Sequence, residues 1–183
     1  MLKVVIGLGN EMPLGKQPSK YAGTRHNVGA DFITHLSVSL KAPFQLQEGF
    51  KYYQEHQCFF VILNSYMNHS GTAIQKVLSH FQCLPEETLI IHDEIELSYG
   101  RLKFKRAGGH RGHNGLRHTI QCLGTNHFCR LSIGVDRVES DDLSDYVLSQ
   151  HQPAQKDKIM QCFHYLYDNL ENILTGQFQE VSL

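Results

Sequence analysis

The sequence has no long apolar run, no CxxC pair and almost no net charge. Its longest apolar runs, such as Cys58 to Leu63, are far shorter than the about 20 residues of a transmembrane helix, so we expect no membrane partner. The five cysteines are scattered, which predicts reduced, mostly structural thiols and a cytoplasmic protein. A formal net charge of −1 means that any nucleic-acid site must be a local basic patch. A strand-like run already begins at Lys3, so we expect no signal or transit peptide.

The sequence does contain apolar runs that alternate with segments of helical spacing. The length of 183 residues fits one domain over 1–183. Buried strands are predicted at Lys3–Leu8, Cys58–Leu63, Thr88–His92 and Phe128–Val135, and a short edge strand at Leu102–Lys105. Helices are predicted at Val28–Leu40, Gly71–Phe81, Leu116–Leu123, a short segment ending at Leu148 that is capped by Asp141, Asp142 or Ser144, and Pro153–Leu174. The alternation predicts an α/β fold with a mostly parallel mixed sheet and helices on both faces.

The stretch from Gly108 to Gly115 holds four glycines, interleaved with histidine, arginine and asparagine. Because glycine loses the most backbone freedom on folding, this density indicates a backbone that bends sharply or lies against a ligand. Basic residues at 103, 105, 106 and 111 accompany it, and glycine-rich backbone amides suit phosphate oxygens. A flexible loop and a solvated charged face remain the alternatives.

Polar residues follow three of the predicted strands, where functional groups of open α/β sheets gather. His26 is the candidate general base because imidazole titrates near neutral pH. Asp93 would orient its ring, and water would replace the serine of a hydrolase triad. Amides of Asn10, Asn68 and Asn114 would position a carbonyl group. The alternatives are asparagines that cap turns and an exposed histidine.

The same segments suggest two other kinds of site. The first glycine turn, Gly7-Leu8-Gly9-Asn10, has Met12 where a dinucleotide fingerprint needs glycine. A metal could use His110, His113 and His118 with His92 and Asp93, but Gly109 and Gly112 disfavour the helix that would align two of these histidines. We therefore predict neither a nucleotide cofactor nor a metal.

Together these segments resemble the bacterial-type peptidyl-tRNA hydrolase family over most of the chain. The matching segments are Val5–Asn10, Tyr21–Gly29, Tyr66–Gly71, His92–Glu94 and Lys103 through Leu116. The resemblance implies an enzyme that hydrolyses the ester between a peptide and the 3′-terminal ribose of tRNA and thereby releases tRNA. It also implies a monomer that works without a metal and binds the acceptor stem and 3′ end of peptidyl-tRNA.

The resemblance assigns roles by position. His26 is similar to the family's catalytic base, Asp93 to its orienting carboxylate, and Asn10 to an asparagine that places substrate and water. The groove residues would be Asn68, Asn114, Tyr21, Met67 and His113. Phosphate binding would use Lys103 and Lys105, with more reliance on Arg106 because Ser132 stands where the family often has a second basic residue.

The chain also departs from the family pattern, and two other functions remain open. Glu11 and Met12 follow Asn10 where the family usually has proline and glycine, and about six extra residues precede Tyr21. One alternative function is a catalytically silent RNA-binding module of the same fold, against which the joint presence of His26 and Asp93 argues. The other is a maturation-type protease, which would need acidic residues in place of the basic glycine loop.

Overall fold

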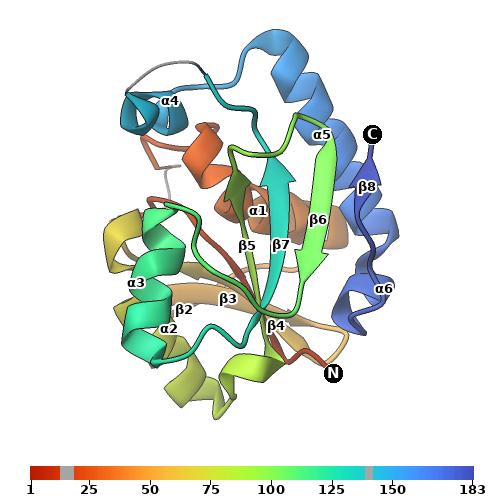
Figure 1. Cartoon of the computed structure of the whole chain (residues 1–183). Coiled ribbons are helices and arrows are strands. Elements are labelled where there is room, and N and C mark those ends of the chain that lie inside the picture. The colour runs from red at the N-terminus through yellow and green to blue at the C-terminus, as the bar shows by residue number, and fades with distance from the viewer. Residues whose placement is uncertain (13–18, 139–141) are drawn as a thin grey trace.

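The computed structural model describes residues 1–12, 19–138 and 142–183. Its strands form one eight-stranded sheet in the order β2-β3-β4-β1-β5-β7-β6-β8 (Figure 1). The strands are β1 (Val4–Gly7), β2 (Gln45–Gln47), β3 (Phe50–Glu55), β4 (Cys58–Leu63), β5 (Thr88–Glu94), β6 (Arg101–Lys105), β7 (Cys129–Gly134) and β8 (Val181–Ser182). The four central strands β4, β1, β5 and β7 are parallel, so their carboxyl ends meet at one edge of the sheet.

The α/β fold and the mixed sheet are confirmed, but the expectation of mostly parallel pairing is wrong. Among the described strands, the pairs β2–β3, β3–β4, β6–β7 and β6–β8 are antiparallel, against three parallel pairs. The strands β3 and β4 are joined by only His56 and Gln57, both with positive φ, and a two-residue turn can connect only antiparallel strands. The predicted edge strand β6 is also not the edge, because β8 pairs with Arg101 and Leu102.

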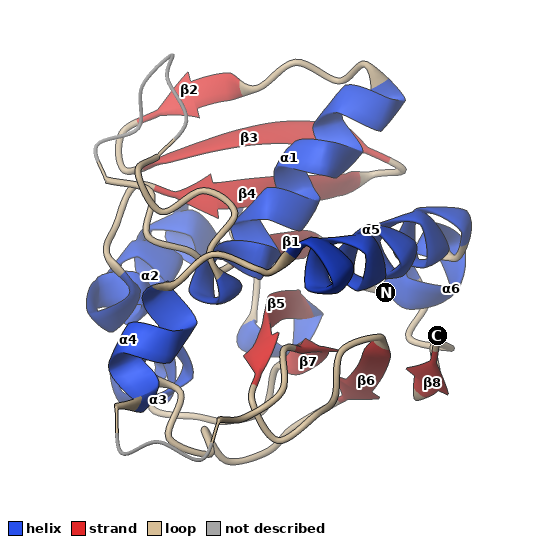
Figure 2. Cartoon of the chain, turned by 90° about the horizontal axis from the view of Figure 1, so that it is seen from above, coloured by secondary structure: helices blue, strands red, loops and turns tan. Residues whose placement is uncertain are grey.

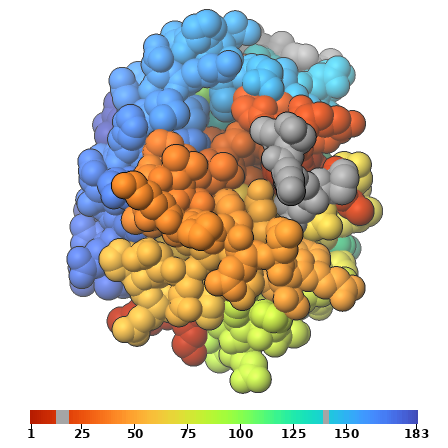
Figure 3. All heavy atoms as spheres, turned by 180° about the vertical axis from the view of Figure 1, so that it is seen from behind, coloured from red at the N-terminus to blue at the C-terminus, as the bar shows by residue number. Residues whose placement is uncertain are grey.

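Helices cover both faces of the sheet, as predicted. They are α1 (Val28–Leu40), α2 (Ser70–Phe81), α3 (Asn114–Leu123), α4 (Leu143–Leu148), α5 (Pro153–Asp168) and α6 (Leu170–Leu174), with short 3₁₀ segments η1 (Arg25–Asn27), η2 (Met67–His69) and η3 (Pro85–Glu87). Alternate β1 residues face opposite cores: Val5 packs with α1, α5 and α6, whereas Val4 and Ile6 pack with α2 and α3. Figure 2 shows these two layers, and Figure 3 shows α1 and α5 side by side on the rear face.

The last predicted helix differs from the structure, whereas one of the three caps suggested for α4 is confirmed. The last predicted helix is divided into α5 and α6 at Asn169, whose side-chain amide donates to the Tyr165 carbonyl at 2.9 Å and competes with the helical backbone. The cap of α4 is Asp142, which accepts from the Asp145 amide. Of the other two suggested caps, Ser144 lies within α4, and Asp141 lies outside the described residues, as do residues 13–18 before Tyr21.

Close packing of α1 on the sheet places the segment that precedes it. A Cβ atom on Gly29 would lie only 2.2 Å from the Ile91 carbonyl oxygen, so the first turn of α1 can touch β5 only because this residue is glycine. The preceding segment η1 is therefore held beside the end of β5. Among the described residues, no helix has the length and apolar character needed to cross a membrane.

Candidate active site

A pocket of about 560 Å³ opens beyond the carboxyl ends of the central strands. It combines side chains that are far apart in the sequence, because β1, β4 and β5 end at the same edge of the sheet. Seven of the predicted site residues line it: Asn10, His26, Met67, Asn68, Asp93, His113 and Asn114.

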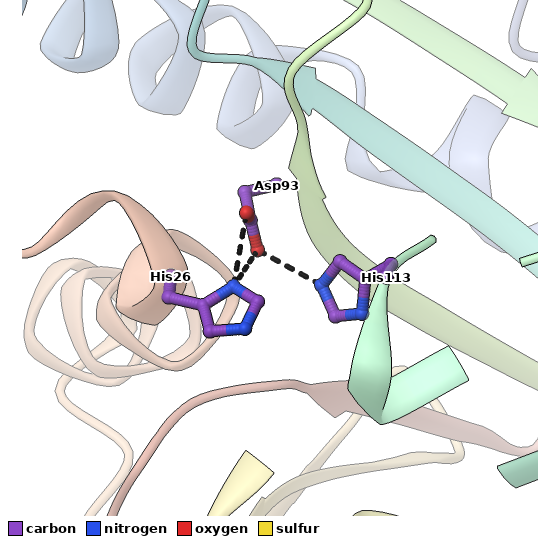
Figure 4. A group of neighbouring side chains, drawn as sticks. All are labelled: His26, Asp93 and His113. Carbon is purple, nitrogen blue, oxygen red and sulfur yellow. Dashed lines mark hydrogen bonds and ion pairs between the residues drawn. The ribbon is translucent and has the colours of Figure 1, made fainter. Parts of the chain in front are cut away.

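His26 and His113 both point at Asp93, from η1 and from the residue before α3 (Figure 4). The Nδ1 atom of His26 lies 2.8 Å and 3.0 Å from the two carboxylate oxygens of Asp93. The Nε2 atom of His113 lies 2.9 Å from Oδ1 of the same carboxylate. The predicted His26–Asp93 pair is therefore formed, and His113 is a second partner that the sequence reasoning had placed only in the groove.

The hydrogen bonds define the proton positions on both rings. Burial disfavours the charged form of Asp93, but the two histidines outweigh it and hold the pKa of this carboxyl well below its usual value. An ionised carboxylate only accepts, so His26 Nδ1 and His113 Nε2 must both donate to it. The Nδ1 atom of His113 accepts from the Leu116 amide at 3.2 Å, which fixes the same tautomer independently. The Nε2 atom of His26 accordingly carries a free lone pair.

The environment of His26 raises the affinity of its ring for a proton. Burial lowers the pKa of His26, but the charge of Asp93 and its hydrogen bond together raise it above the ordinary value. Figure 4 shows that Nε2 of His26 points away from Asp93, and no described group bonds to it. The ring can therefore accept a proton from a molecule in the pocket.

Asn10 is held in one orientation by its neighbours. Its side-chain oxygen accepts from the Met67 amide at 2.8 Å, and its own backbone amide donates to Asn27 Oδ1 at 2.7 Å. The amide nitrogen of the side chain is thereby left as a donor for the pocket. Gly115 allows α3 to approach this region, because a Cβ there would lie 2.5 Å from Met67 Sδ.

Arg25 holds in place the side of the pocket that α4 forms, a role that the sequence analysis did not predict. Its buried guanidinium donates to Ser149 Oγ at 2.5 Å, to the Gln150 carbonyl at 2.9 Å and to Gln155 Oε1 at 2.8 Å, and it stacks on the Tyr146 ring. These contacts tie α4 and α5 to the residue before His26. Leu143, Ser144, Val147 and Leu148 of α4 line the pocket, and the apolar pair at positions 143 and 147 is the signal in the sequence that could have indicated this.

The other four predicted residues lie outside the pocket lining. Lys103 pairs with Glu180 at 2.5 Å, and Arg106 donates to the Gly176 carbonyl, so both contact the C-terminal segment. Lys105 lies two residues further along β6 than Lys103, without a described ion pair. Tyr21 lies under the Lys20 ammonium, 4.9 Å from its ring centre.

Comparison with known proteins shows to which family this chain belongs. The family model described as "Peptidyl-tRNA hydrolase" matches residues 4–182. The chain belongs to the peptidyl-tRNA hydrolase family.

Individual members of the family show the same likeness over nearly the whole chain. The peptidyl-tRNA hydrolase of Marinomonas sp. (strain MWYL1) is 35% identical, with 98% of this chain and 93% of the relative covered. That of Halorhodospira halophila is 34% identical over 96% of this chain and 91% of the relative. The crystal structure of peptidyl-tRNA hydrolase from Acinetobacter baumannii has a TM-score of 0.85 at 28% identity, covering 96% of this chain and 90% of that one.

Two residues that depart from the peptidyl-tRNA hydrolase pattern, Ser132 and Glu11, form hydrogen bonds with neighbouring side chains. Ser132 donates to Nε2 of His92 at 3.1 Å, because Nδ1 of that ring donates to the Asp93 carbonyl. Burial lowers the pKa of His92 to about 3, so the ring is neutral. Glu11, where the family usually has proline, accepts from Asn27 Nδ2 at 2.6 Å and so supports the residue that holds Asn10.

Of the metal ligands that the sequence suggested, Asp93 and His113 are in contact, whereas His118 and His110 are bonded to other groups. His118 Nδ1 accepts from the Gly71 amide and His110 Nδ1 from the Gly112 amide. Ligand atoms of His26, Asp93 and His113 do lie within 4.8 Å of one another. Their contacts are accounted for as two N–H donors on one carboxylate, so their geometry is explained without an ion.

Proposed function

We propose that this peptidyl-tRNA hydrolase family member cleaves the ester between a peptide and the 3′-terminal ribose of tRNA with water activated by His26. The observation that carries the mechanism is the buried His26–Asp93 contact at 2.8 Å, which leaves Nε2 of His26 as an acceptor at the pocket. Family membership supports the substrate. Because the substrate is a product of translation, we propose a cytoplasmic location for the activity.

The reaction proceeds by addition of water and loss of the ribose. Nε2 of His26 removes a proton as the water oxygen bonds to the ester carbonyl carbon, and the carbonyl π electrons move to oxygen. The tetrahedral intermediate then collapses, the carbon–ribose oxygen bond breaks, and the ribose oxygen takes the proton from His26. Asp93 stays ionised throughout and stabilises the transient imidazolium. The products are free tRNA and a peptide with a new carboxyl group.

Asparagine side chains position the reacting groups. Asn10 presents its amide N–H₂ to the pocket, because its oxygen is already bonded to the Met67 amide. It suits the role of donor to the water or to the developing oxyanion. Asn68 and Asn114 are exposed residues of the same pocket and would contact the peptidyl group and the terminal adenosine.

The tRNA backbone would extend from the pocket to the basic residues of β6 and the glycine-rich loop. The residues that we propose for phosphate contact are Lys103, Lys105 and Arg106. Lys103 and Arg106 already contact the C-terminal segment, whereas Lys105 has no described ion pair. The protein would act as a monomer and would need no metal.

The test is hydrolysis of N-acetylaminoacyl-tRNA in water enriched in ¹⁸O. We expect free tRNA, with one label in the released carboxyl group and none in the ribose hydroxyl. Binding without release would favour the silent RNA-binding module. Cleavage of a peptide bond in a protein substrate, with the ester left intact, would favour the maturation-type protease.

A further inference from the structure

Arg111 occupies a backbone conformation that does not suit its side chain. His110 to His113 form a β-turn in which the His113 amide donates to the His110 carbonyl at 2.9 Å. The two central residues have positive φ, 46° for Arg111 and 82° for Gly112. This geometry, type I′, favours glycine, asparagine or aspartate at both positions. The turn would therefore form more readily with a residue other than arginine.

The location of Arg111 suggests why an arginine stands there. Most other described non-glycine residues with positive φ lie at helix ends or in the β3–β4 turn. Arg111, by contrast, lines the pocket two residues before His113, whose ring contacts Asp93. The pocket's other arginine, Arg137, is already paired with Glu96. The lining also carries the carboxylates of Asp93 and Glu94, but no described hydrogen bond or ion pair involves the Arg111 guanidinium, so its donors are available to a ligand.

Arg111 also connects the pocket with the basic residues of β6. Figure 1 shows the loop that runs from the end of β6 across the front of the sheet to the start of α3. The guanidinium of Arg130 holds this loop on β7 through the Gly109 carbonyl at 2.6 Å. The pKa of Lys105 is lowered, first by burial and then by the charges of Arg111 and Lys103. Lys105 is therefore within electrostatic reach of both Lys103 and Arg111, with Glu94 as the opposing charge.

We propose that Arg111 binds an internucleotide phosphate of the single-stranded CCA end of tRNA, next to the ester that is cleaved. The inference rests on the proposed function, because only that substrate carries phosphates beside the reacting ester. A guanidinium matches phosphate oxygens in two parallel hydrogen bonds, which offsets the unfavourable backbone conformation. Arg111 thus binds the nucleotide side of the substrate and takes no part in the chemistry.

Two substitutions separate the side chain from the backbone. Arg111→Gly removes the cation and keeps the turn, since glycine adopts positive φ readily. Arg111→Lys keeps the charge but loses the two-pronged contact. The matched control is Lys41→Gly, which also removes an exposed cation at positive φ (54°). Lys41 caps the far end of the 13-residue helix α1, about 20 Å along that helix from η1.

The experiment compares N-acetylaminoacyl esters of adenosine, which has no phosphate, and of the CCA trinucleotide. For Arg111→Gly we expect kcat/KM on the CCA ester to fall about tenfold at low salt, through KM, with the adenosine ester unchanged. Arg111→Lys should lose less, and Lys41→Gly should match the parent on both esters. Equal losses on both esters, or no loss on either, would overturn the proposal.

Binding of the CCA trinucleotide without an aminoacyl group gives a readout that does not depend on catalysis. We expect affinity to fall about tenfold in Arg111→Gly and the salt dependence to flatten by about 0.7 of a logarithmic unit. If the parent cleaved neither ester, the proposed function would fail, while this titration would still decide whether Arg111 binds a phosphate. Identical titrations for parent and Arg111→Gly would refute the contact.

Discussion

Replacing Asp93 with asparagine should disable His26 without removing any atom from the site. In the parent, Oδ1 of Asp93 accepts from both rings, whereas Oδ2 contacts only His26, at 3.0 Å. His113 must keep donating through Nε2, because its Nδ1 accepts from the Leu116 amide. The asparagine oxygen therefore stays at the Oδ1 position, and its N–H₂ group faces His26 Nδ1.

An N–H₂ group at that position favours the tautomer of His26 with the proton on Nε2, the nitrogen that should accept from water. The loss of charge also removes the group that raises the pKa of His26 against burial. General base catalysis contributes about 10²–10⁴-fold, or roughly 2.7–5.5 kcal/mol. Because both ring tautomers are constrained, we expect a loss near the upper end of this range.

The assay is single-turnover cleavage of saturating N-acetylaminoacyl-tRNA by the parent, Asp93→Asn and Asp157→Asn. Asp157 lies exposed on α5 and offers the same chemical change away from the pocket. We expect the loss in the chemical rate and not in KM, with melting temperatures that show all three proteins folded. A chemical rate for Asp93→Asn within threefold of the parent would refute the orienting role.

Four further outcomes follow from the contacts. The value of kcat/KM should rise with pH through the pKa of His26, above the ordinary 6.5, because the base works only when neutral; a midpoint below that value would contradict the carboxylate's effect. Dialysis against a strong chelator should leave turnover unchanged, and recovery only upon added metal would overturn the metal-free mechanism. Arg25→Ala should lower the free energy of unfolding by about 2–4 kcal/mol, measured by urea titration, because it removes the hydrogen bonds of the buried guanidinium to Ser149 and Gln150 and its stacking on Tyr146. Lys105→Ala should flatten the salt dependence of tRNA binding by nearly one logarithmic unit and Lys103→Ala by less, since Lys103 already pairs with Glu180; equal slopes in parent and variants would place the phosphates elsewhere.

The centre of the site was predictable because it depends on local patterns and on one rule of sheet geometry. His26 precedes a helix with clear apolar spacing, and Asp93 lies just after the apolar run Leu89–Ile91 of β5, so both belonged at the carboxyl edge of a parallel sheet. The contact of His113 with Asp93 was not predictable in this way. It depends on the path of the glycine-rich loop, which no periodicity encodes.

The features that the sequence did not predict share a physical cause. Each depends on contacts or conformations that leave no local signal in the sequence. The strand β3 escaped notice because its turn, His56-Gln57, takes positive φ without the glycine or asparagine that usually indicates a hairpin. Arg25 bonds to residues some 124 positions away, which spacing along the chain cannot suggest. The break at Asn169 interrupts an apolar pattern that is itself continuous.

The central claim is that Nε2 of His26 takes a proton from water, and the most direct measurement is single-turnover cleavage of N-acetylaminoacyl-tRNA by His26→Ala. We expect a loss of about 10²–10⁴-fold in the chemical rate, with tRNA affinity and melting temperature close to those of the parent. Added imidazole should restore part of the rate, by supplying the missing base to the vacated space. A His26→Ala rate within a few-fold of the parent, insensitive to imidazole, would contradict the account.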